Sequence, residues 1–356
     1  MVVRKEEDLD VVESIVGRNT CLRQSMSSAV IILNALSGRS FQNVSMRTEE
    51  DGMPVLEVRE VSKSFDAVRA VCEVSFSAQR GEILGFLGPN GAGKTTTIRM
   101  IMGFLQPDQG EIRFTLNGQS NQVNKERIGY LPEERGLYDD AKVLDTLIYF
   151  AELKGLPRSE AQTQVLEWLE RFDLTEWAKR KIEKLSKGMQ QKVQFIAAVL
   201  HRPDLVVLDE PFSGLDPVNQ DLFKEVIREL KEDGMTILLS SHQMNRVEEL
   251  CDGIFLIHHG KRVLYGNLSE IKEAHGEHVV RLRYAGNAGF LSIDPRVKDL
   301  RMSGDRATFT LHKEVEPDAF IRGIPPDLVI REIAVERPPL HDIFVHTVAG
   351  RNHETQ

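Results

Sequence analysis

The sequence predicts an α/β fold in two parts, a large α/β domain followed by a smaller one. Over most of the chain after Met53, short apolar segments that suit buried strands alternate with segments of helical periodicity, which is the pattern of an α/β domain. Near His275 the composition changes, and a second set of alternating apolar segments begins. We therefore expect the large domain at residues 53–270, the small accessory domain at 271–350 and a tail at 351–356.

Length and composition favour a folded globular protein. The chain has 356 residues, and 41% of them are hydrophobic, which is enough for a sizeable core. There are 45 Lys and Arg against 54 Asp and Glu, and the resulting net charge of −9 disfavours a uniformly basic nucleic-acid-binding protein. No apolar run approaches the roughly 18–20 residues that span a bilayer. The three cysteines lack the spacing of a metal site.

The first part of the chain, residues 1–52, differs from the rest. It begins and ends in acidic runs and contains stretches with Ser and Asn, and Met53-Pro54 then leads directly into a strand pattern. We expect this segment to be an N-terminal extension outside the folded domain, either disordered or read from a misplaced start codon and so not native.

The large domain is expected to combine buried strands with a helical insertion. Residues 95–103 have the periodicity of a helix, and residues 141–187 lack strand signals but repeat apolar residues at helical spacing. A linker helix is expected to begin at 267–271. The predicted strands are the apolar or alternating runs at 55–58, 71–76, 83–87, 205–208 and 236–239.

The small domain shows three strand patterns and one closing helix. The strands are predicted at 279–284, 307–311 and 329–335, and the helix at 338–348.

A glycine-rich run is the most specific motif, because it matches the phosphate-binding pattern G-x-x-x-x-G-K-[ST] and lies between a predicted strand and a predicted helix. Glycines let successive backbone N–H groups point at phosphate oxygens, and the helix N-terminus adds its positive dipole end. A chance match in a chain of this length has a probability of about 1% at average residue usage. The residues expected to bind a nucleotide are Gly88, Pro89, Asn90, Gly91, Ala92, Gly93, Lys94, Thr95 and Thr96. Within them, Lys94 would reach the β- and γ-phosphates, and the Thr95 hydroxyl would bind Mg²⁺.

Two acidic residues, Asp209 and Glu210, end the apolar run 205–208. A carboxylate at a strand end beside a phosphate loop can hold Mg²⁺, directly or through water, and we expect this role for Asp209. Glu210 would then orient or deprotonate the attacking water. Two acids at a strand end are weak evidence alone, because strand ends often reach solvent, but beside the phosphate loop the functional interpretation is the stronger one.

A third motif lies between these two. The run Leu185-Ser186-Lys187-Gly188-Met189-Gln190-Gln191 resembles the Leu-Ser-Gly-Gly-Gln signature of ATP-binding-cassette (ABC) ATPases. Further segments resemble other elements of that family over about residues 55–266. They are the run 61–65 ending in the aromatic Phe65, the run 210–217 containing Glu210 and Asp216, and the run 239–242 ending in His242.

This resemblance implies a P-loop NTPase of ABC type, with a RecA-like core, an antiparallel β subdomain and a helical insertion. It also implies two subunits that enclose two ATP molecules, with Ser186 and Gly188 of one subunit on the γ-phosphate held by the other. Phe65 would stack on the adenine, His242 would hold the γ-phosphate and help to position water, and Asp216 would belong to the loop after the acidic pair. The plainer alternatives are a hydrogen-bonded core histidine for His242 and a core aromatic ring for Phe65.

The motifs depart from the family pattern at three positions. Lys187 stands where the family has a glycine and Met189 where it has a glutamine, although Ser186 and Gly188 remain. In the run 128–135, Glu133 stands where the family places a glutamine that binds Mg²⁺ and water. A carboxylate is a harder, charged oxygen ligand for Mg²⁺, so we expect Glu133 to bind the metal and to take part in the reaction.

The runs 130–138 and 186–192 resemble a bacterial export subgroup that includes sodium- and drug-efflux ATPases, and residues 339–344 approximately match the end of its C-terminal domain. The resemblance implies the ATPase subunit of a membrane exporter, with ATP and Mg²⁺ as cofactors and an identical second ATPase subunit. It further implies a separate transmembrane permease, which would hold this chain at the cytoplasmic face of the membrane. The coupling helix of the permease would lie in a groove around residues 130–138. No nucleic-acid partner is expected.

Two other classes remain as alternatives. One is a soluble ABC ATPase that acts on nucleic acid or ribosomes, which the single cassette and the absence of sustained heptads and cysteine clusters disfavour. The other is a phosphate-loop kinase, which has no need of the signature run or of His242.

Overall fold

The computed structural model describes residues 53–116, 119–120, 125–134, 136–274 and 277–353. The chain divides into two units, residues 1–51 and 52–356, and the described residues belong to the second unit. The extension expected at residues 1–52 therefore lies outside the described residues. Among the described residues, no helix is both long and apolar enough to cross a membrane.

A six-stranded sheet forms the centre of the large domain, with the order β10-β9-β3-β8-β7-β6. Neighbouring strands are parallel, except that β10 runs antiparallel to β9. Every residue of β3, β7 and β8 is buried, as expected for parallel strands that are covered on both faces. The strands are β3 (Ile83–Leu87), β6 (Ile128–Leu131), β7 (Leu205–Asp209), β8 (Thr236–Ser241), β9 (Gly253–His258) and β10 (Lys261–Asn267). The strands predicted at 83–87, 205–208 and 236–239 are confirmed.

The sheet register brings three motifs to one edge. Leu87 of β3 lies opposite Ser241 of β8, and Asp209 of β7 lies opposite Ser240 of β8. Because these strands are parallel and adjacent, the loops that follow them leave the sheet side by side. The phosphate loop, the acidic pair and the histidine segment therefore meet at the carboxyl ends of β3, β7 and β8.

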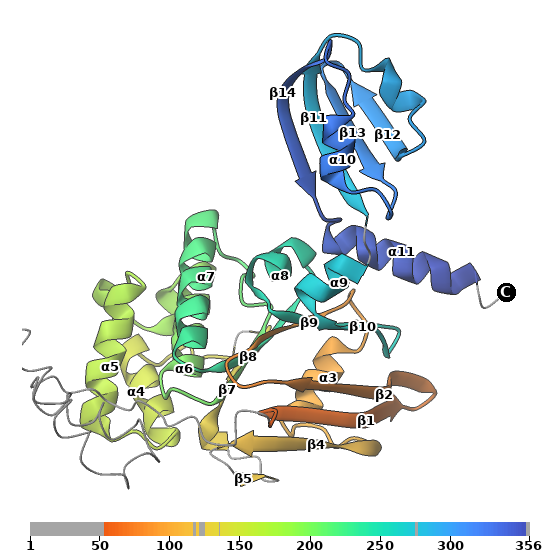
Figure 1. Ribbon diagram of the computed structural model, residues 1–356. Helices are drawn as coiled ribbons and strands as arrows, with labels where there is room; N and C mark the ends of the chain where they lie inside the picture. Colours follow the sequence, from red (N-terminus) through yellow and green to blue (C-terminus); the bar gives the residue numbers. More distant parts are fainter. Residues whose placement is uncertain (1–52, 117–118, 121–124, 135, 275–276, 354–356) are drawn as a thin grey trace, which may run out of the picture. The chain divides into compact units, whose positions relative to one another are not determined.

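A second, antiparallel sheet has the order β2-β1-β4-β5 (Figure 1). Its strands are β1 (Leu56–Phe65), β2 (Val68–Ala78), β4 (Gln109–Leu116) and β5 (Gln119–Ser120). β1 and β2 are longer than the runs predicted at 55–58 and 71–76. Register shifts between Val58 and Val61 and between Val61 and Lys63 interrupt the regular alternation, so the pattern stops before the strand does.

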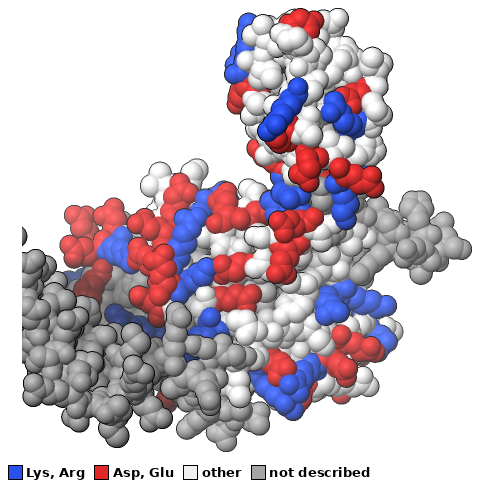
Figure 2. All heavy atoms as spheres, in the orientation of Figure 1, with Lys and Arg blue, Asp and Glu red and all other residues white. Residues whose placement is uncertain are grey.

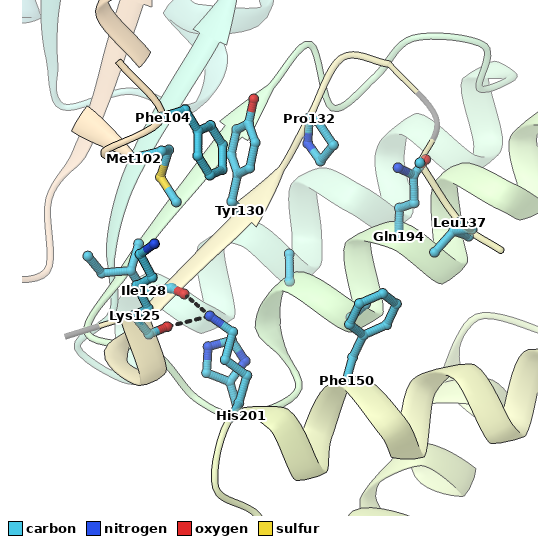
Figure 3. Close-up of a pocket in the computed structure, with 14 residues that line it drawn as sticks. Met102, Phe104, Lys125, Ile128, Tyr130, Pro132, Leu137, Phe150, Gln194 and His201 are labelled. Carbon is cyan, nitrogen blue, oxygen red and sulfur yellow. Dashed lines mark hydrogen bonds between the residues drawn. The ribbon is translucent and has the colours of Figure 1, made fainter. Parts of the chain in front are cut away.

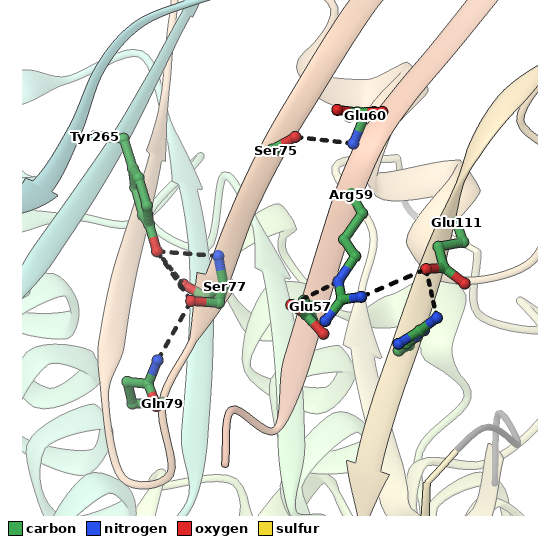
Figure 4. Close-up of polar contacts among 9 residues, drawn as sticks. Glu57, Arg59, Glu60, Ser75, Ser77, Gln79, Glu111 and Tyr265 are labelled. Carbon is green, nitrogen blue, oxygen red and sulfur yellow. Dashed lines mark hydrogen bonds and ion pairs between the residues drawn. The ribbon is translucent and has the colours of Figure 1, made fainter. Parts of the chain in front are cut away.

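Polar contacts cover the surface of this sheet and tie it to the central one. Figure 4 shows the Arg59 guanidinium between the carboxylates of Glu57 and Glu111, with closest distances of 2.7 and 3.8 Å. In the same view, the Tyr265 hydroxyl of β10 donates to the Ser77 carbonyl of β2 at 3.0 Å and accepts from the Ser77 N–H at 3.0 Å. These bonds join an edge strand of the central sheet to an edge strand of the antiparallel sheet.

The helices of the large domain include the predicted insertion. α4 buries Val143, Leu147 and Ala151, which lie four residues apart and so form one apolar face. The insertion predicted at 141–187 is confirmed by α4 and α5, which lie together in Figure 1 away from β1, β2 and β4. The helices are α3 (Lys94–Ile101), α4 (Val143–Leu153), α5 (Arg158–Arg171), α6 (Lys187–Val199), α7 (Pro217–Glu232) and α8 (Met244–Leu250).

The C-terminal part of the chain forms a third sheet, of order β12-β13-β11-β14. Its elements are α9 (Leu268–Ala274), β11 (His278–Ala285), β12 (Val297–Ser303), β13 (Arg306–Leu311), α10 (Pro317–Arg322), β14 (Val329–Glu336) and α11 (Leu340–His353). The three predicted strands are confirmed as β11, β13 and β14, whereas β12 and α10 were not predicted. α9 crosses the expected boundary at 270/271, and α11 continues into the expected tail, so the domain boundaries stay predictions.

Gly129 of β6 allows the closest approach of a helix to the central sheet. A Cβ atom at this position would lie 2.1 Å from the carbonyl oxygen of Ala198 in α6. We expect Gly129→Ala to lower the free energy of unfolding by about 3 kcal/mol, because a backbone oxygen cannot move aside without shifting the helix. Chemical denaturation measures the change, with Gly136→Ala as the control, since a Cβ there meets no atom within 4 Å. Equal stability of the two variants would contradict this packing.

Candidate active site

The phosphate loop connects β3 to α3. Gly93, the residue before α3, has a φ of 110°, which a residue with a side chain rarely adopts. A Cβ atom at Gly93 would also lie 2.6 Å from the Ala70 carbonyl oxygen. Ala92 is buried, and its carbonyl accepts a hydrogen bond of 2.9 Å from the Gly260 N–H, while Asn90 and Gly91 are exposed. The loop is thus held from one side and open to solvent at its tip.

Lys94 occupies the centre of this loop. Its ammonium donates to the Gly88 carbonyl at 2.7 Å and to the Pro89 carbonyl at 3.3 Å. Burial lowers the pKa of Lys94, and the nearby carboxylates of Glu210, Asp209 and Glu133 oppose that shift. All three acidic residues predicted for the site are therefore near enough to act electrostatically on Lys94. An ammonium near carboxylates, in a loop whose tip is open to solvent, suits the binding of a phosphate group together with Mg²⁺.

Asp209 ends β7 with a buried carboxylate. Burial raises its pKa to about 6, and the neighbouring Glu133 and Glu210 add to the shift. Its Oδ2 atom is buried and has no hydrogen-bond partner. A buried carboxylate oxygen of this kind can be satisfied by a cation or by the water bound to one.

The residues present thus fit Mg²⁺. Thr95 lies in the first turn of α3, and Glu133 lies exposed just after β6. Among the described residues, no group of three His, Cys, Asp or Glu side chains is placed to hold a metal ion by itself. Mg²⁺ commonly binds to one or two carboxylates together with phosphate oxygens and water, so the nucleotide would supply part of its coordination here.

Glu210 follows Asp209 in a left-handed conformation, with a φ of 50°. This region is unfavourable for a residue with a side chain and is often found at functional sites. The Glu210 N–H donates to the Ser240 carbonyl at 3.1 Å. This turn directs the Glu210 side chain toward the segment after β8.

His242 lies directly against Glu210. Its backbone N–H donates to Glu210 Oε1 at 2.8 Å, and its Nδ1 atom lies 2.7 Å from the same oxygen. The imidazole is about half exposed, with 53% of the side chain accessible, while only 12% of the Glu210 side chain is accessible. The expected water-activating residue and the expected γ-phosphate-binding residue therefore form one pair, with the histidine on the solvent side.

This pairing and the part played by Ser240 were not predicted from the sequence. Ser240 lies opposite Asp209, its carbonyl fixes the Glu210 turn, and its side chain lowers the pKa of Asp209. The signal that could have found it is the adjacency of two parallel strands that both end in polar residues.

Ser186 and Asp216 each cap a helix. The Ser186 Oγ accepts from the Met189 N–H at 3.3 Å at the start of α6, and the Asp216 Oδ1 accepts from the Asn219 N–H at 3.0 Å at the start of α7. A Cβ atom at Gly188 would lie 3.4 Å from the Gly214 carbonyl, so these two loops are neighbours. In the part of the chain that the structure describes, neither cap forms a hydrogen bond with the phosphate loop.

Phe65 ends β1 beside the turn to β2. Its side chain is 45% exposed, and Lys63 Nζ lies 5.8 Å from the ring centroid. The ring is therefore available for stacking on a planar ligand, and the core-packing alternative does not describe it.

A separate pocket of about 310 Å³ lies where α4 and α6 approach β6 (Figure 3). Its lining is chiefly apolar and includes Phe104, Tyr130 and Phe150. Burial lowers the pKa of His201, a further lining residue, to about 4, so this ring is neutral at pH 7. Lys154 contributes an ammonium that donates to the Ile128 carbonyl at 2.8 Å. The sequence analysis expected a groove around residues 130–138, and Tyr130, Pro132, Gly136 and Leu137 line this pocket.

Comparisons with known proteins agree with these motifs. Residues 71–213 match the family described as ABC transporter, and residues 266–348 match the C-terminal domain described as ATP-binding protein DrrA1-3-like. The uncharacterized ABC transporter ATP-binding protein YhaQ of Bacillus subtilis (strain 168) is 42% identical, over 83% of this chain and 99% of its own length. The linearmycin resistance ATP-binding protein LnrL of the same organism is 32% identical over the same shares.

A solved structure of the ATP-binding subunit of an ABC transporter shares the fold. It is 34% identical to this chain, with a TM-score of 0.58 over 62% of this chain and 93% of that one.

Proposed function

This chain belongs to the family of ABC transporter ATP-binding proteins, and from that membership we propose that it drives the export of a small solute through a separate membrane permease. It has the P-loop fold of ABC ATPases, binds ATP and is an ATPase. The name of LnrL, a resistance protein, supports a drug-like solute, and the sodium-efflux resemblance leaves sodium as the other candidate. The meeting of the phosphate loop, the acidic pair and the histidine segment at the carboxyl ends of β3, β7 and β8, with His242 Nδ1 2.7 Å from Glu210 Oε1, is the observation that supports hydrolysis most directly.

The chain's own residues divide the work of hydrolysis. Lys94 would leave the Gly88 and Pro89 carbonyls and bind the β- and γ-phosphates, where it offsets negative charge that is redistributed during phosphoryl transfer. Glu210 would accept a hydrogen bond from the attacking water and align it with the γ-phosphorus. His242, paired with Glu210, would hold that carboxylate in place and contact the γ-phosphate from the solvent side.

The cofactor would be Mg²⁺, held by Thr95, Asp209 and Glu133, and it would supply positive charge to the phosphate oxygens. The buried, unpaired Oδ2 atom of Asp209 supports this assignment.

A second copy of the chain would complete the site. Ser186 and Gly188 lie at the N-terminus of α6, where backbone N–H groups and the helix dipole favour an anion. Because this N-terminus makes no hydrogen bond with its own phosphate loop, it is free to meet the γ-phosphate held by a partner subunit. ATP would then bind more tightly to the closed pair than to the separate subunits, and hydrolysis would reopen it.

The permease would bind at the pocket lined by Phe104, Tyr130 and Phe150. Phe104 is 59% exposed, and its ring centroid lies 5.8 Å from that of Tyr130. An apolar hollow between helices suits an amphipathic helix with one buried anchor. Tyr130 is in β6 and Glu133 follows that strand, so a helix bound here would act directly on the segment that carries the metal-binding carboxylate.

Replacing Phe104 tests this assignment. We expect Phe104→Glu to reduce co-purification of the membrane permease by about tenfold or more, because the loss of an interface anchor typically costs about 2 kcal/mol. ATP hydrolysis by the isolated subunit should stay within about twofold. Ile293→Glu is the matched control, since Ile293 is 84% exposed in the C-terminal part. Undiminished co-purification of the Phe104 variant, or the lack of any co-purifying membrane protein, would contradict the proposal.

The charge distribution favours this function over action on nucleic acid. On the face of the described residues seen in Figure 2, basic and acidic side chains alternate, and the net charge of the chain is −9. Stimulation of the ATPase by DNA or RNA would favour the alternative.

A further inference from the structure

The C-terminal helix α11 is built into the core of the ATPase domain. Leu340 is fully buried and Ile343 is 2% exposed, and both belong to the same apolar cluster as Val247 and Leu250 of α8. α11 contacts α8 directly. Although α11 follows the C-terminal sheet in the chain, its first turn thus packs with the helix that comes directly after His242.

Glu248 of α8 accepts a hydrogen bond from the first residue of α11. Its Oε1 atom accepts from the Leu340 backbone N–H at 3.0 Å and from Lys272 Nζ of α9 at 2.8 Å. The Glu248 side chain is only 19% exposed. One carboxylate therefore satisfies the first N–H of α11, an unpaired donor at a helix N-terminus, and also pairs with the helix that leads out of the ATPase domain.

α8 transmits this contact to the site. It begins two residues after His242 and packs on β3 and β8, the two strands that end at the phosphate loop and at the histidine segment. His242 in turn holds Glu210 Oε1 through its backbone N–H and its ring. A short chain of contacts therefore links Leu340 to Glu210. It runs from Leu340 to Glu248, along α8 to His242, and from His242 to the Glu210 carboxylate.

A second contact of α11 is with a segment that supports the phosphate loop. The ring of Phe344 lies edge-on to His258 at the end of β9, with 5.9 Å between centroids. Two residues later, the Gly260 N–H donates to the Ala92 carbonyl in the phosphate loop. α11 therefore touches supports of both the histidine segment and the phosphate loop.

We propose that Glu248 is a positioning residue for ATP hydrolysis, through which the seating of α11 sets the placement of His242 against Glu210. The C-terminal domain is thereby a regulator of turnover, because any partner or movement that draws α11 away releases α8 and the histidine with it. This inference rests on the proposed roles of Glu210 and His242. If it is correct, weakening the contact between α11 and Glu248 slows the chemical step of hydrolysis and leaves the affinity for ATP unchanged.

The test measures steady-state ATP hydrolysis by the full chain. We expect Glu248→Ala to lower kcat about tenfold, because small displacements of a reacting group are costly, while the KM for ATP stays within about twofold. Glu248→Gln should retain at least half of the wild-type kcat, since its amide oxygen still accepts from the Leu340 N–H. Glu248→Met, which keeps the length of the side chain and removes both acceptors, should behave like the alanine variant even if the latter folds poorly.

The matched control is Glu273→Ala, which removes a different contact to the same region, the 4.0 Å pair with Arg337, and does not involve α8. Its kcat should equal that of the wild type. Wild-type kcat in both Glu248→Ala and Glu248→Met would overturn this inference alone, as would a fall in kcat that the glutamine variant fails to rescue or that comes with an equal rise in KM. A wild-type chain without ATPase activity would instead overturn the proposed function, and this inference with it.

Discussion

Glu210→Gln is expected to bind ATP normally and to hydrolyse it at least about 100-fold more slowly, the usual contribution of a residue that accepts a proton from the attacking group. The amide keeps the size of the side chain and an oxygen toward His242, but it has no charge with which to activate water. Because hydrolysis would no longer reopen the closed dimer, the variant should also accumulate as a dimer. Phosphate release measures the first effect, and light scattering with and without Mg-ATP measures the second.

Glu225→Gln makes the same chemical change on α7, where the side chain is exposed, and should leave both readouts unchanged. Normal turnover by Glu210→Gln would contradict the role of Glu210 in activating the attacking water. A variant that binds ATP yet remains monomeric at every concentration would contradict the two-subunit site.

Lys94→Ala is expected to lose at least about 100-fold in ATP affinity. Lys94 is buried, and its positive charge interacts with the carboxylates of Glu210, Asp209 and Glu133. Without it, those carboxylates would face the triphosphate directly, and charge-assisted hydrogen bonds are among the strongest in binding sites. Isothermal titration with ADP and with ATP measures the loss, which should be larger for ATP because the γ-phosphate adds charge.

Lys187→Ala is the matched control for Lys94, since it removes an exposed lysine next to the capping Ser186. In monomeric protein its affinity for ATP should equal that of the wild type. An unchanged affinity of Lys94→Ala would show that the loop does not bind the phosphates.

Much of the fold could be predicted because local patterns determine it. Ile83–Leu87 and Leu205–Asp209 are buried on both faces, so their sequences are continuous apolar runs. β12 escaped prediction because all seven of its residues are at least partly exposed, and its sequence VKDLRMS shows no apolar face. A register shift between Lys298 and Arg301 breaks the alternation, although Val297 and Leu300 still pack against the apolar cluster of the C-terminal part, and pairing with β13 makes that segment a strand.

The candidate site divides in the same way. The phosphate loop and the acidic pair are runs of adjacent residues, so their chemistry is visible in the sequence. The contact between Glu210 and His242 joins residues 32 positions apart, and that between Glu248 and Leu340 joins residues 92 positions apart. Such contacts depend on strand order and helix packing, which no local pattern specifies. Sequence motifs identified the phosphate-binding and acidic residues, whereas only the structure identified what holds them.

The two helix caps at Ser186 and Asp216 affect the entropic cost of bringing two subunits together. Each loop that would face the second subunit is already fixed by its own cap, and the two loops touch each other near Gly188. The backbone entropy of these segments is therefore lost during folding rather than at each encounter. In the proposed two-subunit site, a preorganised surface of this kind would allow repeated closing and opening with little free energy spent on ordering the interface, and more of the free energy of nucleotide binding would remain to move the proposed permease.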